Sequence, residues 1–479
     1  MTHALDRSSD QRTLVIVLSA MVAVVVSSAT AAAIDQAAIA EAFGAGPADV
    51  AWVVFGYSAM FAVATVLYAS VAARVGVGRS MAIGTLVFGA GAAAAAIAPT
   101  LPLVILARMA QGLGSGAIPT LSIALVAARL DGPARIQAIG ATVAGVGVGY
   151  VLGPVLGGLL LEAVGWRGPL AMGIVIAPAA WLVLRADPAP GDPRARVDLR
   201  GIVLLGTVAV GWIVTLNRLP LLGVAPLTVG AMTVAILAGW SAVARGRSDP
   251  GAIPPRRMTG DRQFRRLLWT GAIGQSTYLG AVVAVPIALA RAQDVGGMGF
   301  AAVLLPMAII VAVASPRAGR FGVRYGRRRT SMSALAGLAL AAVGMAISGP
   351  DGPIPVVAGL LGLVGLCIAV LQPPIVDEVT EVFRGVDRSL AIGLFYLAYF
   401  VGGATGGAVA SALIQAGLEL PVFAGSAVPG FSTAMIALGV LPAIGAVGLA
   451  RAPAGPAPPG HGSSFTGGTA VPDTDDPTP

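Results

Sequence analysis

The segment "GVGVGYVLGPVLGG", residues 145–158, repeats small residues inside a long apolar run. Gly145, Gly149, Gly153 and Gly157 recur every four residues, so on a helix they follow one slowly drifting face. Glycine and proline disfavour helices in water. In lipid, by contrast, helices associate through close backbone contact, which small residues permit. The segment therefore predicts a membrane helix that packs tightly along this glycine face.

The whole chain has the composition of a membrane protein. Of its 479 residues, 56% are hydrophobic and 11% are charged, and the mean hydropathy is +0.86. A bilayer core about 30 Å thick takes roughly 20 apolar residues per helix. We therefore expect an all-α integral membrane protein with fourteen transmembrane helices. The predicted spans are 13–34, 50–72, 80–98, 102–127, 136–161, 168–185, 200–217, 221–244, 266–290, 299–317, 330–348, 353–376, 388–415 and 431–450.

The distribution of arginine predicts the orientation. All the basic residues other than histidine are arginines. With the N-terminus inside, only Arg167, Arg218 and Arg291 fall in outer loops, Arg108 falls within a span, and the others lie in inner loops or tails. This asymmetry follows the positive-inside rule. It predicts a multi-pass protein of the bacterial inner membrane with both termini cytoplasmic, and it explains the basic balance without nucleic acid.

Several chemistries lack the residues they need. The two histidines, His3 and His461, lie in the tails, and Cys367 is the single cysteine. Because there is no lysine, a Walker-type phosphate loop is absent as well. We therefore expect no enzyme activity, no metal site and no cofactor. Residues 1–12 are expected to form a cytoplasmic tail, and residues 451–479, rich in proline, glycine, serine and threonine, a disordered one.

The chain repeats itself at one offset. Arg74-x-Gly76 in "ASVAARVGVGR" (69–79) is echoed by Arg324-x-Gly326 in "GRFGVRYGRRR" (319–329). The glycine-rich segment 145–158 is echoed by "YFVGGATGGAVAS" (399–411). Both pairs are eight predicted helices apart, which fits parallel repeats of a transporter. We expect six-helix halves at 13–185 and 266–450, joined by a linker, 186–265, with two extra transmembrane helices.

These motifs resemble those of the major facilitator superfamily. "LARMAQGLGSG" (106–116) and the segment 145–158 resemble its signature elements, and the two basic loops resemble its Gly-x-Leu-Ala-Asp-Arg-x-Gly-Arg-Arg element. "GWRG" (165–168) and "ADVAWVVFGY" (48–57) fit as well. The resemblance covers residues 13–450 and is closest to the fourteen-helix drug/proton antiporters, of which this chain would be a divergent member. It implies the major facilitator fold, with the proton gradient as energy source.

The resemblance gives the glycine segment a role. In such antiporters the matching element lies at the contact between the halves and restricts leak. The alternative is generic tight packing, because small-residue motifs are common between membrane helices. The residues concerned are Gly145, Gly149, Gly153, Pro154, Gly157 and Gly158. Pro154 and Gly158 also allow a bend.

Arg108 is a charge inside a predicted span. It lies about two turns, roughly 9 Å, from the outer end of its helix. Gln111 and Ser115 continue a polar or small face below it and are candidate cavity residues. In the family the matching arginine faces the central cavity and takes part in proton coupling. The alternative is that its side chain snorkels to the outer surface.

Acidic residues depart from the family pattern. The first-helix place that usually holds an acid is Ser28 here, and Asp35, seven residues later on nearly the same face, is the candidate for a displaced proton site. The alternative is a solvated residue at the helix end. The loop aspartate of the family is replaced in both repeats, by Ala73 and Val323. Ordinary gating through the loop residues Arg74, Gly76, Arg324 and Gly326 is therefore in doubt.

Further polar residues lie on helices expected to line a cavity. Gln275, Tyr278 and Gln372 suit hydrogen bonds to a mixed polar and apolar ligand, and equally suit contacts between helices. Asp377 and Glu378 could load a proton if buried. Alternatively, Arg384 and Arg388 neutralise them near the end of their helix.

These features predict a secondary active exporter that works by alternating access. We expect proton-coupled efflux of amphipathic drugs or endogenous small molecules by a monomer in the lipid bilayer. One alternative is a weakly coupled lipid or metabolite exporter or facilitator, which the missing acids favour. Another is a transport-inactive membrane sensor or scaffold.

Overall fold

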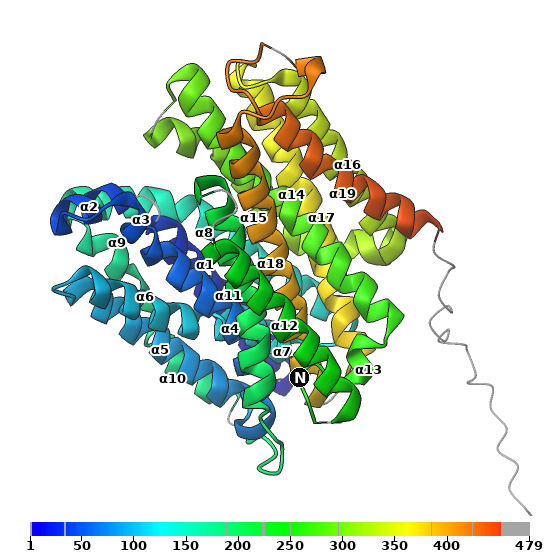
Figure 1. Cartoon of the computed structure of the whole chain (residues 1–479). Helices are drawn as coiled ribbons and strands as arrows, with labels where there is room; N and C mark the ends of the chain where they lie inside the picture. Colours follow the sequence, from blue (N-terminus) through cyan, green and yellow to red (C-terminus); the bar gives the residue numbers. More distant parts are fainter. Residues whose placement is uncertain are drawn as a thin grey trace, which may run out of the picture.

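The described part of the chain is a bundle of helices. The computed structural model describes residues 2–32, 35–187, 189–222, 226–249, 251–295, 297–384, 386–423 and 425–451. The predicted disordered tail after Arg451 and His461 within it lie outside these residues. Every regular element in the described ranges is helical (Figure 1).

The first half contains the helices before residue 187. They are α1 (Thr2–Ala31), α2 (Gln36–Phe43), α3 (Pro47–Val50), α4 (Trp52–Val75), α5 (Val77–Ile97), α6 (Leu101–Ser115), α7 (Ala117–Arg129), α8 (Gly132–Val164), α9 (Arg167–Ala171), the 3-10 helix Met172–Ile176 and α10 (Ala179–Ala186). Residues 2–12, expected as a tail, continue α1. The span predicted at 102–127 is two helices, α6 and α7, separated at Gly116.

The inserted hairpin and the second half follow. Their helices are α11 (Leu199–Leu222), α12 (Pro226–Ser248), α13 (Arg256–Thr259), α14 (Arg262–Gln293), α15 (Gly297–Tyr325), α16 (Arg327–Ser348), α17 (Ile354–Val382), α18 (Val386–Ala416), the 3-10 helix Pro421–Phe423 and α19 (Phe431–Arg451). Thirteen spans in the described ranges are long and apolar enough to cross a membrane, and Ala302–Ala318 of α15 is a shorter apolar stretch. These fourteen segments coincide with the predicted spans.

Two pairs of helices form the seam between the halves. Helix α8 packs against α15, and α4 packs against α18. Helix α11 contacts both α4 and α18, so the inserted hairpin lies over one side of the seam (Figure 1). The side of the hairpin away from the bundle is apolar and exposed, as at Trp240 of α12. A water-soluble protein would bury such a surface, whereas a bilayer covers it.

The glycine face of α8 contacts α1, a helix of the same half. A Cβ placed on Gly145 would fall on the carbonyl oxygen of Ser19, and one on Gly153 would fall on the Thr30 hydroxyl. The expectation that this face lies at the contact between the halves is therefore wrong. That contact uses a different face of α8, where Gly140 and Gly147 lie against α15. Pro154 does not end the helix, because α8 is continuous from Gly132 to Val164.

This packing predicts that leucine at Gly153 and leucine at Gly158 have different effects on transport. We expect Gly153→Leu to abolish transport while the protein still reaches the membrane, because a Cβ there would lie 2.7 Å from the Ser27 carbonyl oxygen and closer still to Thr30. Gly158→Leu is the matched control, since a Cβ there has no neighbour within 4 Å. Export assays on reconstituted variants check this. Parent-like export by both variants would show that the contact with α1 is dispensable.

Candidate functional site

Arg108 of α6 is completely buried, so it does not snorkel to the surface. Its Nε donates to the Val53 carbonyl oxygen at 3.4 Å, and its guanidinium lies 4.3 Å from the centre of the Tyr57 ring. Its Nη1 donates to Oε1 of Gln111, whose Nε2 donates in turn to Ser28 Oγ at 3.0 Å. Ser28, at the place where the family pattern has an acid, is thus joined to Arg108 through Gln111.

Asp35 lies between α1 and α2, just beyond the first spanning helix, and is also completely buried. This excludes the solvated alternative. Within the described structure neither carboxylate oxygen accepts a hydrogen bond, Arg108 Nη2 has no hydrogen-bond partner, and the two side chains form no ion pair. Burial raises the pKa of Asp35 to about 7, against the lowering effect of the Arg108 charge. Burial thus favours the protonated form of this carboxyl.

An apolar cap surrounds this acid. Ala32 before Asp35 and Ile39 after it are buried in one cluster with Val50, Val53 and Trp166. The Phe43 and Trp166 rings meet edge to face at 5.2 Å between centroids. Helices α2 and α3 follow α1 at this end of the bundle (Figure 1). In such a place an uncompensated carboxylate costs far more free energy than a protonated carboxyl.

A small cavity lies between the two halves. It measures ≈ 60 Å³, below the range of about 300–1,000 Å³ typical of ligand pockets. Gln275 and Gln372 line it, as predicted. Tyr278 packs on a lining residue, Tyr150, at 5.8 Å between centroids. Gln111 and Ser115, also predicted there, are not among the lining residues; Ser115 Oγ donates to the Gly112 carbonyl.

Aromatic pairs connect the halves across this cavity. Phe61 of α4 meets Phe400 of α18 at 4.3 Å between centroids, and Tyr150 of α8 meets Tyr278 of α14. None of the described lining residues is charged. Valine, aromatic and amide side chains make up most of the lining.

Four charged residues form a second connection, which we call the inter-half charge cluster. Arg135 of α8 donates to Asp377 and to Glu381 of α17, both at 2.6 Å. Arg327 of α16 donates to the same two carboxylates, at 2.7 and 2.5 Å. The Asp377 side chain is wholly buried and that of Arg135 is 9% exposed. The cluster ties the first half to the second.

The predicted partners of the α17 acids were wrong. Arg388 donates instead to the Ala127 carbonyl oxygen, and the partners of Asp377 are Arg135 and Arg327. Glu378 accepts from Gln263 at 2.6 Å, within the second half. Sequence reasoning missed Arg135 and Glu381. The available signal for Glu381 was its spacing of four residues from Asp377, which places both on one helix face.

Residues after α10 contact the loop between α4 and α5, in which Ala73 replaces the aspartate of the family pattern. Asp187, after α10, accepts from the backbone N–H of Gly78 at 3.0 Å and pairs with Arg129 at 3.1 Å. This carboxylate satisfies a free N–H at the start of α5. The backbone N–H of Asp192 donates to the carbonyl of Ala73 at 2.9 Å. The segment after α10 thus fastens the loop between α4 and α5.

The predicted loop residues end helices rather than forming ion pairs. Gly76 and Gly326 have φ of 99° and 82°, a region that favours glycine. Arg74 and Arg324 are exposed, and neither forms an ion pair within the described ranges. The connection between the halves is made elsewhere, by the inter-half charge cluster.

Comparisons with known proteins agree with this architecture. A model of the Major Facilitator Superfamily matches residues 16–248 and 267–472. The methylenomycin A resistance protein of Bacillus subtilis (strain 168) is 24% identical over 262 residues, 54% of this chain and 56% of that protein. The cephamycin export protein CmcT of Amycolatopsis lactamdurans is 27% identical over 348 residues, 66% of this chain and 68% of that protein. The match to the first relative thus spans little more than half its length.

Two solved structures share the fold. The human organic anion transporter MFSD10 (TETRAN) superimposes with a TM-score of 0.65 at 16% identity, over 91% of this chain and 99% of its own. The proton:xylose symporter XylE, bound to 6-bromo-6-deoxy-D-glucose, superimposes with a TM-score of 0.65 at 13% identity, over 92% and 95%. At these identities the similarity concerns the fold.

Proposed function

This chain belongs to the Major Facilitator Superfamily, and on that premise we propose that it exports small amphipathic molecules in exchange for protons. It is a multi-pass membrane transporter and not an enzyme. The direction of transport is supported by two distant relatives, one named for antibiotic resistance and one for antibiotic export. The arginine distribution supports cytoplasmic termini in a bacterial plasma membrane.

The observation that carries proton coupling is the buried, unpartnered carboxyl of Asp35 beside Arg108. The buried site of Asp35 favours the neutral carboxyl. A carboxylate would be stabilised by approaching Arg108 Nη2, which has no hydrogen-bond partner in the described structure. A movement that brings the two together favours proton release, and their separation favours proton uptake. Arg108 is already held by Val53, Gln111 and Tyr57, so Asp35 is the partner that moves.

The central cavity supports an amphipathic ligand. Gln275 Oε1 is buried without a hydrogen-bond partner, so it can accept from a ligand hydroxyl or amine. When the halves separate, the Phe61–Phe400 and Tyr150–Tyr278 contacts break and expose rings on which an aromatic ligand can stack. Because none of the described lining residues is charged, we propose a ligand that is uncharged in its buried part.

Closure at one end supports alternating access. The inter-half charge cluster joins α8 to α17 at one end of the bundle, and the arginine distribution supports a cytoplasmic location for that end. The apolar cap around Phe43 and Trp166 lies within the first half. We assign Asp377 to this closure rather than to proton loading, because two guanidinium groups hold its carboxylate.

The proposal is tested with Asp35→Asn in proteoliposomes. We expect the parent to accelerate export of a fluorescent amphipathic dye when a pH gradient is imposed, and the variant to lose that acceleration while still binding the dye, because an amide cannot take up the proton. Glu41→Gln, an exposed acid on α2, is the matched control and should respond like the parent. If Asp35→Asn still responds to the gradient, export is not coupled through Asp35. A weakly coupled exporter, favoured by serine at position 28, then becomes the better description.

Thermal unfolding provides an independent check on the ionisation of Asp35. Burial raises its pKa from 3.8 to about 7, so the folded protein binds this proton more tightly than the unfolded chain. The Asp35 contribution to parent stability should therefore fall as pH rises from 3.8 to about 7 and level off above. The difference in melting temperature between Asp35→Asn and the parent should grow over the same interval. A difference that is constant with pH would contradict the raised pKa.

A further inference from the structure

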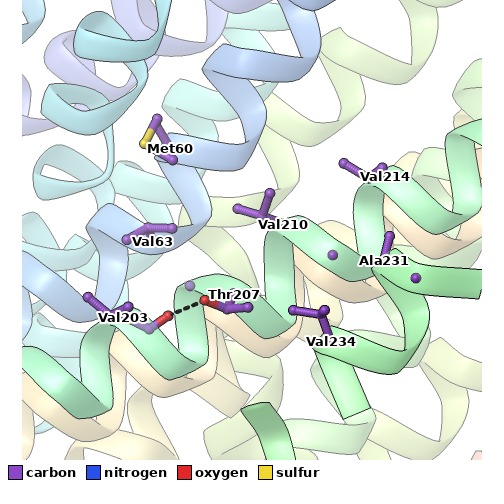
Figure 2. A pocket seen from close by; sticks show the side chains of 11 residues that line it. Met60, Val63, Val203, Thr207, Val210, Val214, Ala231 and Val234 are labelled. Atoms are coloured by element: carbon purple, nitrogen blue, oxygen red, sulfur yellow. Dashed lines mark hydrogen bonds between the residues drawn. The ribbon is translucent and has the colours of Figure 1, made fainter. Parts of the chain in front are cut away.

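A large apolar pocket lies beside the seam, outside the central cavity. It measures ≈ 610 Å³ and is bounded by α4, α11 and α12. Figure 2 shows Met60 and Val63 of α4 facing Val203 and Val210 of α11, with Val234 of α12 at one side. Glycines, among them Gly206 and Gly230, leave the space open because they carry no side chain.

The described lining residues offer few partners to water. Thr207 is the polar side chain among them, and its Oγ1 already donates to the Val203 carbonyl oxygen at 2.8 Å (Figure 2). A buried water needs two to four polar partners, which the described side chains do not supply. A dry void of this size would forfeit dispersion contacts along all its walls. Hydrocarbon is the chemistry that fills it favourably.

The position of the pocket identifies the source of that hydrocarbon. Its residues lie within three membrane-spanning segments, Trp52–Val75, Leu199–Leu216 and Thr228–Ser248. Two rim residues face outward: Val203 is 64% exposed and Val234 is 51% exposed. The pocket therefore opens toward the acyl region of the bilayer. We propose that it binds one acyl chain of a membrane phospholipid.

The bound chain would link the inserted hairpin to the first half. On its other side, α11 is joined directly to the second half, since Trp212 Nε1 donates to Thr405 Oγ1 of α18 at 2.8 Å. Toward α4, Gly206 lies against Val63. The hairpin therefore contacts both halves directly, and the acyl chain would add to its packing on α4.

Gly230→Phe tests the site because a side chain there would occupy the pocket. A Cβ on Gly230 has no neighbour within 4 Å, so the ring can enter without displacing protein. Gly448→Phe on α19 is the matched control, since Gly448 is equally unobstructed and lies outside the pocket. The proteins are reconstituted in phosphatidylethanolamine and phosphatidylglycerol vesicles containing a phospholipid with a diazirine at mid-chain, then irradiated, and the labelled peptides are identified by mass spectrometry.

We expect adducts concentrated on Val203–Val214 in the parent and in Gly448→Phe, and reduced about tenfold in Gly230→Phe, which corresponds to lost burial of about two methylene groups. Val234→Trp, which narrows the rim, is a second variant with the same expected result. Equal labelling of Val203–Val214 in all four proteins would overturn the proposal. So would retention of fewer lipids by Gly448→Phe than by Gly230→Phe after delipidation, measured by native mass spectrometry.

Discussion

Asp377→Asn is expected to open the end of the transporter that the inter-half charge cluster holds closed. The substitution removes the buried carboxylate between Arg135 and Arg327 and leaves Glu381 as their shared partner, with the exposed Asp131 at 3.9 Å from Arg135. Breaking a buried ion pair costs about 3–5 kcal/mol. At about 1.4 kcal/mol per decade, this shifts the balance between closed and open states by a hundredfold or more.

The opening can be measured with spin labels. Cys367 is buried and is the single cysteine, so a Cys367→Ala background accepts labels at the exposed positions Arg79 and Arg329, one on each half. Double electron–electron resonance should show a longer distance between the two labels in Asp377→Asn than in this background. Glu378→Gln is the matched control, since Glu378 contacts Gln263 and Arg266 within the second half. An unchanged distance in Asp377→Asn would show that the cluster does not hold the halves together.

Arg108→Ala is expected to stop export with and without a pH gradient. The change removes the charge nearest Asp35, the donor to Gln111 and the cation over Tyr57. Each charge-assisted hydrogen bond contributes about 1.5–3 kcal/mol, so a loss of export of about a hundredfold is expected. Without the Arg108 charge the pKa of Asp35 should also rise further, because burial would act unopposed by that charge.

The two effects of Arg108→Ala are separated by two measurements. Dye export in proteoliposomes reports the first, and the pH dependence of thermal stability reports the second. Arg167→Ala is the matched control, since this exposed arginine also stacks on an aromatic ring, that of Trp166 at 4.3 Å. Parent-like export by Arg108→Ala would remove Arg108 from the coupling site.

The spans could be predicted because their signal is local. Each span is a continuous apolar run, and the small-residue spacing of segment 145–158 is visible without any neighbour. For Arg108 and Asp35 the sequence left both burial and a surface position open, and the tertiary structure decided for burial. Gln275 and Gln372 were predicted as cavity residues because they are polar residues on apolar helices, and both line the central cavity.

By itself, the sequence determined the membrane class, the spans and the two halves, whereas tertiary structure decided which helix meets which. Helix faces that meet lipid and faces that meet another helix are both largely apolar, so hydropathy does not identify a neighbour. The glycine face of α8 therefore packs against α1, and not against the second half as the resemblance implied. Asp377 pairs with Arg135, which is distant in sequence, and not with Arg388, because helix α8 packs against α17 between the halves. The lipid pocket exists only where α11 and α12 leave space beside α4.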